Sequence, residues 1–468
     1  MEEGTVYPLR ELQPVGGTTE ERLVEKYGQH VDMYVEYPHK RNWSHEFTTE
    51  DFEEGLLNLF STGDVPVLLY VHMPYCQTQC WFCTCHVEIT KKYDDVKEYM
   101  RHLYREIDLY RHFFDRHHIV PNFKEIHLGG GSPTFIREPE FDEMVEKLGA
   151  IADIKNLDEF AIEIDPRRVR NERLVYYARK GINRISFGVQ DFDLAVQKAV
   201  NRVQPALLTE RLLTPEVRAL FPNGVNFDII CGLPHQTVES MQRTMETVVE
   251  LSPDRVCLNY LDYSPDSSRY HPHQSLMPAH AIPGESLRKL LFVKALDVLE
   301  AGGYVRTGYD HFAKPSDDVV RAMYEGKMIW NSLGVTPGRC EDIIGMGVHS
   351  YSRLGPRHYA QSMYELSAYV EAVTAGRFPV FRGCKLSQDD IIRRDVIQTL
   401  RSYFFIDFHE VEERYGINFK DYFERELASL EEFQQDGIVS RSDSSLTIPQ
   451  LGHQFANLVC KKFDVYVM

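Results

Sequence analysis

The sequence predicts an α/β protein built on a full or partial (β/α) barrel. From Val65 to His311, predicted strands alternate with helical stretches. The strands are short and rich in Val, Ile and Phe, and several end in Gly, Asp or Pro. Repeated strand–helix units form a parallel sheet with crossover helices. In such a barrel the chemistry takes place at the carboxyl ends of the strands.

The first element is a polar N-terminal arm, residues 1–62, with one predicted helix near Asp51 to Leu59. Its opening, MEEGTVYPLRELQPVGG, has acidic residues where a secretory signal would have positive charge followed by an apolar run. No stretch of the chain approaches the roughly 20 apolar residues that span a bilayer. We therefore expect a cytoplasmic protein.

The barrel domain is predicted to run from residue 63 to residue 384. Its strands are expected at 65–72, 123–130, 159–165, 184–190, 224–232, 255–263 and 303–311. Its clearest helices are expected at 94–115, 138–152, 237–251 and 285–302.

Residues 385–468 differ in character and predict a mostly helical, winged-helix-like C-terminal domain. Two helices are expected in LSQDDIIRRDVIQTLRS and FKDYFERELASLEEFQQDG, followed by the turn SRSDSS and a final helix. The chain has 70 acidic against 52 basic residues and a net charge of −18, which disfavours binding to a phosphate backbone. We therefore expect no nucleic-acid partner and interpret this domain as a lid or packing module.

The cysteines fall into two groups. Five are far apart and are interpreted as buried thiols acting as small hydrophobic side chains: Cys231, Cys257, Cys340, Cys384 and Cys460. The other four lie in CQTQCWFCTC, directly after the strand at 65–72 and therefore at its carboxyl end.

The spacing C-x3-C-x2-C offers three thiolates from Cys76, Cys80 and Cys83. Three thiolates hold three irons of a [4Fe–4S] cluster and leave the fourth iron open. A structural zinc site normally takes four ligands, and an electron-transfer cluster takes four cysteines. Both remain alternatives, as do unliganded thiols. Only one residue separates Cys85 from Cys83, which is an awkward spacing for a fourth cluster ligand. The role of Cys85 therefore stays open, and one hypothesis is that its side chain faces the substrate.

The cysteine loop and its surroundings resemble the radical S-adenosylmethionine (SAM) superfamily. Within it, the chain is similar to the oxygen-independent coproporphyrinogen III oxidase family from Val65 to the end. The segments that carry this resemblance, in order, are YVHMPYCQTQCWFCTCHVEIT, HLGGGSPT, IEIDPR, ISFGVQDFDLAVQKAVNR, FDIICGLPHQT, GYDHFA, IIGMGVHSYS, IRRDVIQTL and CKKFDVYV.

The resemblance implies a [4Fe–4S] cluster on Cys76, Cys80 and Cys83, with SAM chelating the open iron. One-electron reduction then cleaves SAM to methionine and a 5′-deoxyadenosyl radical, and a flavodoxin or ferredoxin is the expected reductant. Family members also bind a second SAM. Glycines lack Cβ and let backbone approach a ligand closely, although a tight turn explains a glycine run equally well. The implied cofactor-binding residues are Tyr70, Phe82, Gly129, Gly130, Gly131, Ser132, Glu163, Gln190, Arg202 and Asp228.

Several pocket segments depart from the family pattern. The arm segment VDMYVEYPHK keeps Tyr34 and Tyr37–Pro38 of the expected PRYTSYPT-like stretch. Ser332 and Leu333 stand where the decarboxylating members have a Phe-Gln pair. Leu261 replaces a small residue and Tyr351 replaces Ile. A tetraanionic tetrapyrrole would need clustered basic side chains, and these altered segments supply few.

Those departures resemble the class C radical SAM methyltransferases, which use two SAM molecules to methylate an sp2 carbon. Leu261, Leu333 and Tyr351 fit a flat, apolar slot. Tyr351, His349 and Tyr263 are candidates to move the proton, although a lone histidine is more often structural. The leading prediction is methylation at C-8 of the menaquinone ring, with at most peripheral membrane contact because no strongly basic amphipathic helix is present.

Three alternatives remain. The first is a coproporphyrinogen III oxidase with an unusual pocket, which decarboxylates its substrate. The second is C-methylation or cyclopropanation in natural-product assembly, and the third is a haem chaperone without catalysis. The expected substrate is thus an aromatic or tetrapyrrole small molecule, and the expected assembly is a monomer.

Overall fold

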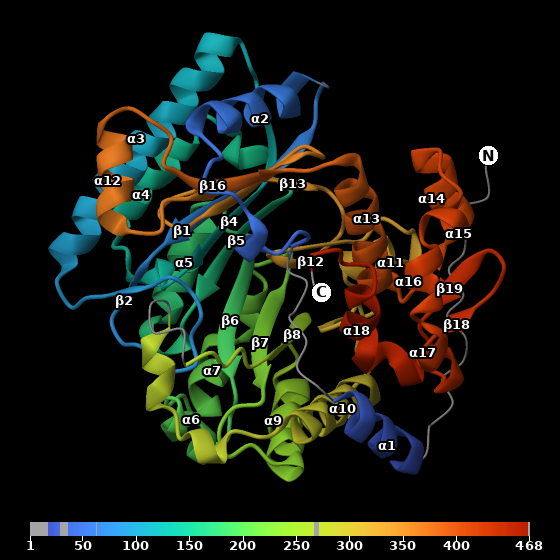
Figure 1. Cartoon of the computed structure of the whole chain (residues 1–468). Coiled ribbons are helices and arrows are strands. Elements are labelled where there is room, and N and C mark those ends of the chain that lie inside the picture. Colours follow the sequence, from blue (N-terminus) through green and yellow to red (C-terminus); the bar gives the residue numbers. More distant parts are fainter. Residues whose placement is uncertain (1–16, 29–35, 62, 266–270, 467–468) are drawn as a thin grey trace.

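The computed structural model describes residues 17–28, 36–61, 63–265 and 271–466, with side chains from Arg22 onward. Tyr34 of the arm lies outside the described residues, as do residues 266–270. The chain forms one large sheet wrapped by helices, with the C-terminal region at one side (Figure 1).

The large sheet contains twelve strands in the order β16-β15-β14-β13-β1-β4-β5-β6-β7-β8-β10-β9. Their bounds are β1 Pro66–Met73, β4 Asn122–Gly130, β5 Glu159–Ile164, β6 Arg184–Gln190, β7 Val225–Cys231, β8 Arg255–Tyr260, β9 Val305–Arg306, β10 His311–Ala313, β13 Asp342–Met346, β14 Tyr351–Leu354, β15 His358–Ser362 and β16 Val380–Lys385. Small sheets pair β2 (Tyr75–Cys76) with β3 (Glu88–Ile89), β11 (Ile329–Asn331) with β12 (Gly334–Thr336), and β17 (Phe405–Asp407) with β19 (Ser445–Thr447) and β18 (Ser440–Arg441).

Seven neighbouring strands, from β13 through β1 and β4 to β8, run parallel. Among the described residues β16 and β9 are the end strands and do not pair with each other, so the barrel is partial. Parallel strands buried on both faces are continuously apolar. β1 shows this, because Val67, Leu68, Leu69 and Val71 are fully buried.

Helices such as α3, α4, α5 and α9 cover the outer face of this sheet, whereas α1 lies beside α10 and the C-terminal region (Figure 1). Their bounds are α1 Gly17–Tyr27, α2 Thr49–Ser61, α3 Tyr93–His117, α4 Glu138–Leu148, α5 Asn171–Arg179, α6 Leu194–Ala199, α7 Ala206–Leu212, α8 Pro215–Arg218, α9 Val238–Leu251, α10 Glu285–Ala301, α11 Asp318–Tyr324 and α12 Leu366–Thr374. The C-terminal region adds α13 Gln388–Tyr403, α14 Phe408–Tyr415, α15 Phe419–Tyr422, α16 Glu424–Ala428, α17 Glu431–Gln435 and α18 Ala456–Lys461.

Local sequence explains where the helices begin. α9 starts with a capping box, in which Thr237 and Ser240 satisfy each other's free backbone N–H groups. Ser387 and Asp390 form the same motif at the start of α13. Residues of α3 with helical spacing, among them Tyr99, Leu103 and Tyr110, are buried against the sheet.

One predicted strand is wrong. The segment 303–311 was expected as the seventh barrel strand, but it forms β9 and the start of β10, two short antiparallel strands. Gly308, at φ +86°, turns the chain between them, and only glycine adopts this conformation without strain. β13 takes the seventh parallel position instead, beside β1.

The C-terminal region is helical, as expected, and also carries a small sheet in which β18 and β19 form a hairpin. The helix expected over 419–437 is broken into α15, α16 and α17. Phe419, Phe423, Leu427, Leu430 and Phe433 recur every three or four residues and all contribute to one apolar cluster. Side chains of α1 join the same cluster. The predicted domain limits stay a prediction.

Within the described part of the chain, no helix combines the length and the apolar character needed to cross a bilayer.

Candidate functional site

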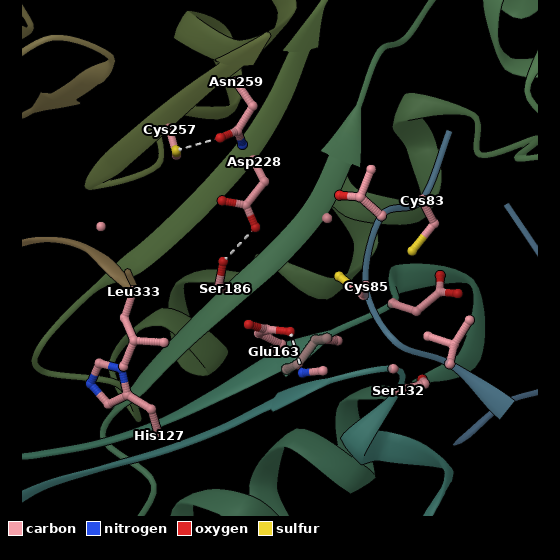
Figure 2. A pocket seen from close by; sticks show the side chains of 18 of the residues that line it. Cys83, Cys85, His127, Ser132, Glu163, Ser186, Asp228, Cys257, Asn259 and Leu333 are labelled. Atoms are coloured by element: carbon pink, nitrogen blue, oxygen red, sulfur yellow. Dashed lines mark hydrogen bonds between the residues drawn. The ribbon is translucent and has the colours of Figure 1, made fainter. Parts of the chain in front are cut away.

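A cavity of about 880 Å³ lies at the carboxyl ends of the parallel strands. The cysteine loop, the glycine turn after β4, the hairpin of β11 and β12, and Lys40 of the arm also line it. Figure 2 shows Cys83, Cys85, Ser132 and Glu163 at one side of this cavity and Leu333 at another. A volume of this size accommodates small-molecule ligands.

The cysteine loop leaves β1 and is fixed by hydrogen bonds at several points. The amide of Glu88 donates to Pro74 and that of Thr90 to the carbonyl of Cys76. Asn201 donates to the carbonyl of Gln79, and Gln274 donates to that of Phe82. A loop held at both ends and in the middle presents its thiols from fixed positions.

The three predicted cluster ligands line the same cavity. The sulfur of Cys80 accepts hydrogen bonds from the guanidinium groups of Arg167, at 3.5 Å, and Arg202, at 3.4 Å. Charged donors of this kind stabilise a thiolate. Burial and the charges of Cys83 and Cys80 raise the pKa of the Cys76 thiol. Three cysteines from one short loop line the same cavity, and this set of sulfur donors fits an iron–sulfur cluster.

Cys85 also lines the cavity. Its thiol forms a hydrogen bond with the sulfur of Cys83, which lowers the pKa of Cys83 and raises that of Cys85. Figure 2 shows the two sulfurs on the same stretch of loop. Cys85 therefore contacts a predicted cluster ligand, and its role stays open.

The glycine turn lies between the loop and β5. The amide of Gly130 donates to Glu163 at 3.1 Å, and the amide of Gly131 donates to the carbonyl of Met73 at 2.7 Å. A Cβ on Gly130 would lie 2.6 Å from the His72 ring, and a Cβ on Gly131 would lie 2.9 Å from Met73 O. The turn needs glycine at both positions, which leaves backbone facing the cavity.

Acidic side chains at the strand ends point into the cavity. Burial and the charge of Asp228 raise the pKa of Glu163. Asp228 accepts a hydrogen bond from Ser186 at 2.9 Å (Figure 2). It accepts a second from Asn226, also at 2.9 Å. Both carboxyl groups retain the capacity to accept bonds from a ribose or an amino group.

The structure brings together all predicted site residues except two. Gly129 and Tyr263 do not line the cavity. Gly129 is covered by Glu163 and Tyr70, and Tyr263 packs in a small apolar cluster with Cys80 and Leu261. The remaining residues line it: Tyr70, Phe82, Gly130, Gly131, Ser132, Glu163, Gln190, Arg202, Asp228, His349, Tyr351, Cys76, Cys80 and Cys83.

His349 and Tyr351 sit in different surroundings. Burial and the neighbouring His72 and His86 lower the pKa of His349 to about 2, so its ring is uncharged at neutral pH. Burial and the charge of Glu36 raise the pKa of Tyr351 well above its ordinary value, so its hydroxyl keeps its proton. The Lys40 ammonium lies 4.5 Å from the centre of the Tyr351 ring. Catalytic roles for His349, Tyr351 and Tyr263 stay predictions.

Sequence reasoning missed several cavity residues. Lys40, Arg137 and Arg168 line it, and each lacks an ion pair among the described residues. His311 and Asn331 line it as well. The segments GYDHFA and WNSLGVTPG contain these last two, but neither spacing nor residue type distinguished them from ordinary turn residues.

The comparisons with known proteins agree with this geometry. The Radical SAM superfamily model matches residues 70–248, and the HemN C-terminal domain model matches residues 386–455. An oxygen-independent coproporphyrinogen III oxidase from Synechocystis is 33% identical over 95% of this chain and 94% of its own length. One from Helicobacter pylori is 32% identical over 95% of this chain and 96% of its own. The solved structure of the Escherichia coli coproporphyrinogen III oxidase, a radical SAM enzyme, has a TM-score of 0.85 and 31% identity and covers 94% of this chain and 100% of its own.

The predicted class C methyltransferase acting on menaquinone is wrong. The full-length relatives are coproporphyrinogen III oxidases, and the likeness includes both the barrel and the C-terminal region. The prediction weighed the altered segments alone, whereas the basic side chains of the cavity come from the arm and from other loops. Radical SAM proteins carry a [4Fe–4S] cluster that binds SAM, and the loop residues fit it. The chain belongs to the oxygen-independent coproporphyrinogen III oxidase family of the radical SAM superfamily.

Proposed function

We propose that this protein is an oxygen-independent coproporphyrinogen III oxidase, which converts propionate side chains of a tetrapyrrole into vinyl groups. The observation that carries this proposal is the full-length likeness to relatives of that name, at 31–33% identity over 95% of the chain. The cavity supports it, because its cations suit a substrate with several carboxylates.

Cys76, Cys80 and Cys83 would hold the cluster, and the cavity beside them would take two SAM molecules. Gly130, Gly131 and Glu163 form one group of candidate contacts, and Gln190, Arg202 and Asp228 form another. When bound, the cluster and SAM supply one-electron chemistry that removes a hydrogen atom from an unactivated carbon. A flavodoxin or ferredoxin in the cytoplasm is the expected electron donor.

The atoms and electrons balance in the overall reaction of each propionate side chain of the substrate. A propionate, –CH2–CH2–COO⁻, loses one hydrogen atom from the carbon next to the ring, one CO2 and one electron, and leaves –CH=CH2. The electron passes to an external one-electron acceptor. No proton has to be delivered, so an uncharged His349 and a protonated Tyr351 are consistent with positioning the substrate.

The side chains of the cavity have two tasks in this reaction. Lys40, Arg137 and Arg168 offer positive charge to carboxylates that do not react. Leu261 and Leu333 line the wall with apolar groups that hold the ring system and exclude water. Both tasks orient one propionate at a time toward the cofactor side.

The test is anaerobic incubation of the reconstituted protein with coproporphyrinogen III, SAM and a reductant, followed by product mass spectrometry. The proposal predicts a SAM-dependent product that has lost formic-acid equivalents and carries vinyl groups. Cys80→Ser is the matched control and should give none. Unchanged substrate together with tight haem binding would favour the haem chaperone, and a gain of CH2 would restore methylation.

A further inference from the structure

The segment between α6 and α7 lies against the cysteine loop. Asn201 donates to the carbonyl of Gln79 at 2.9 Å. The next residue, Arg202, is buried, and its guanidinium donates to the sulfur of Cys80 at 3.4 Å. One buried side chain therefore connects this stretch of backbone with a predicted cluster ligand.

Two large apolar side chains of the same segment are exposed. Val203, next to Arg202, and Leu207, in the first turn of α7, are each 48% exposed. Neither residue lines the cavity, so both stay outside the space for SAM and substrate. Single exposed apolar side chains are common on protein surfaces, and their surroundings decide what they indicate.

Exposed cations lie beside these two side chains. Arg211 follows Leu207 by four residues in α7 and therefore lies on the same helix face. Asn171 donates to the carbonyl of Arg211 at 3.1 Å, which places its neighbour Arg170 beside α7. Lys198 lies in the last turn of α6. Arg170, Lys198 and Arg211 are exposed, and none of them has an ion-pair partner among the described residues.

The charge of this region differs from that of the rest of the chain. Residues 165–211 contain ten basic and five acidic side chains, whereas the whole chain has 52 basic and 70 acidic ones. That count includes two exposed acidic side chains of the region, Glu172 and Glu210. An acidic partner is therefore repelled by most of the protein and attracted to this region.

The five exposed residues form one surface, which we call the α6–α7 surface: Arg170, Lys198, Val203, Leu207 and Arg211. We propose that this surface docks an acidic electron-transfer protein, which passes one electron to the cluster on the cysteine loop. The carrier is oxidised by one electron and the cluster is reduced by one, and no proton or chemical group is transferred. This inference rests on the proposed function, in which a one-electron donor is required.

The position of the α6–α7 surface suits electron delivery. It begins one residue from Arg202, whose guanidinium contacts Cys80, so packed protein atoms connect it to a predicted cluster ligand. Arg167, three residues before Arg170, contacts the same sulfur at 3.5 Å. The surface lies outside the cavity, so the donor can bind while SAM and substrate are in place. Redox proteins meet through small, weak interfaces, and complementary charge speeds their encounter.

The test measures how tightly a flavodoxin of net negative charge, in its oxidised form, binds the reconstituted protein, using the anisotropy of a fluorescent label on flavodoxin. The double variant Arg170→Glu/Arg211→Glu should weaken binding at least about tenfold at low salt and reduce its salt dependence. Leu207→Ser should weaken binding to a similar extent at every salt concentration, because salt does not screen an apolar contact. Arg116→Glu is the matched control. It reverses an exposed charge in the last turn of α3, at the end of the sheet opposite to the cavity, and should change the affinity less than about twofold.

Reduction of the cluster, followed by its absorbance under anaerobic conditions, gives a second measurement. Reduced flavodoxin should reduce the double variant at least about tenfold more slowly than the wild type, whereas dithionite should reduce both at rates within about twofold. Wild-type affinity for flavodoxin in the double variant, or an equal loss in Arg116→Glu, would overturn the docking surface. Equal slowing with flavodoxin and dithionite would also overturn it, because the cluster itself would then be altered. Neither measurement contains a tetrapyrrole, so a failure of decarboxylation would leave the result on docking intact.

Discussion

The ion pair of Asp310 and Arg401 joins the C-terminal region to the cavity wall, and Asp310→Asn tests what it contributes. The Nη2–Oδ2 distance is 3.1 Å, and both residues are almost fully buried. At an effective dielectric constant of about 20, two unit charges at that distance attract by about 5 kcal/mol. The Trp330 ring, whose centre lies 3.5 Å from the Arg401 guanidinium, would retain about 1–2 kcal/mol of favourable interaction with the uncompensated charge.

We therefore expect Asp310→Asn to lower the free energy of unfolding by about 3–5 kcal/mol, as for other buried pairs that lose one partner. The assay is urea unfolding of the wild type, Asp310→Asn, Arg401→Met and the double variant. Because the double variant removes both charges, its loss should be smaller than the sum by at least about 2 kcal/mol.

The exposed pair of Lys420 and Asp443 provides the control cycle. Its coupling energy should stay below about 0.5 kcal/mol, because solvent screens it. A coupling energy of that size for Asp310 and Arg401 would refute the reasoning, since the buried contact would then contribute no more than a surface pair.

Three further predictions follow from single sites. Serine at any of the three predicted cluster cysteines should abolish iron and sulfide content after reconstitution, whereas Cys85→Ser should keep both; loss of the cluster in Cys85→Ser would make it a ligand. Gly130→Ala places a Cβ 2.6 Å from the His72 ring at φ +107°, so SAM affinity measured by calorimetry should fall at least about tenfold; unchanged affinity would show that the turn adapts. Burial raises the pKa of Glu106 to about 7, although Tyr369 donates to it. Protonated Glu106 therefore stabilises the fold below about pH 4.5, and that stability is lost as the pH rises toward 7. Relative to Glu106→Gln, the wild type should lose about 3 kcal/mol of unfolding free energy over this range; parallel pH profiles would contradict the shift.

Strand and helix positions in the barrel could be predicted because the strands are short segments rich in Val, Ile and Phe, and several of them end in turn residues. β1, β6 and α9 lie within one or two residues of the expected limits. The segment 303–311 could not be predicted, because its apolar residues read equally well as one strand or as two strands joined at Gly308. The antiparallel pairing of β10 with β8 selects two strands over one. This contact joins segments that are far apart in the sequence, so local patterns do not reveal it.

The cysteine loop could be predicted in detail because its spacing is chemically specific. The substrate side could not, since its side chains come from segments far apart in the chain. Lys40 belongs to the arm, His311 to β10 and Asn331 to a hairpin, and each looks like an ordinary surface residue in sequence. The substrate prediction failed at that point, because it counted basic residues only in the segments that differ from the family pattern.

The most direct test of the central claim is release of labelled CO2. Coproporphyrinogen III with ¹³C in its propionate carboxyl groups should yield ¹³CO2 in step with vinyl product, and only when SAM and a reductant are both present. Consumption of SAM without ¹³CO2, together with a substrate that keeps every carboxyl group, would contradict the assignment.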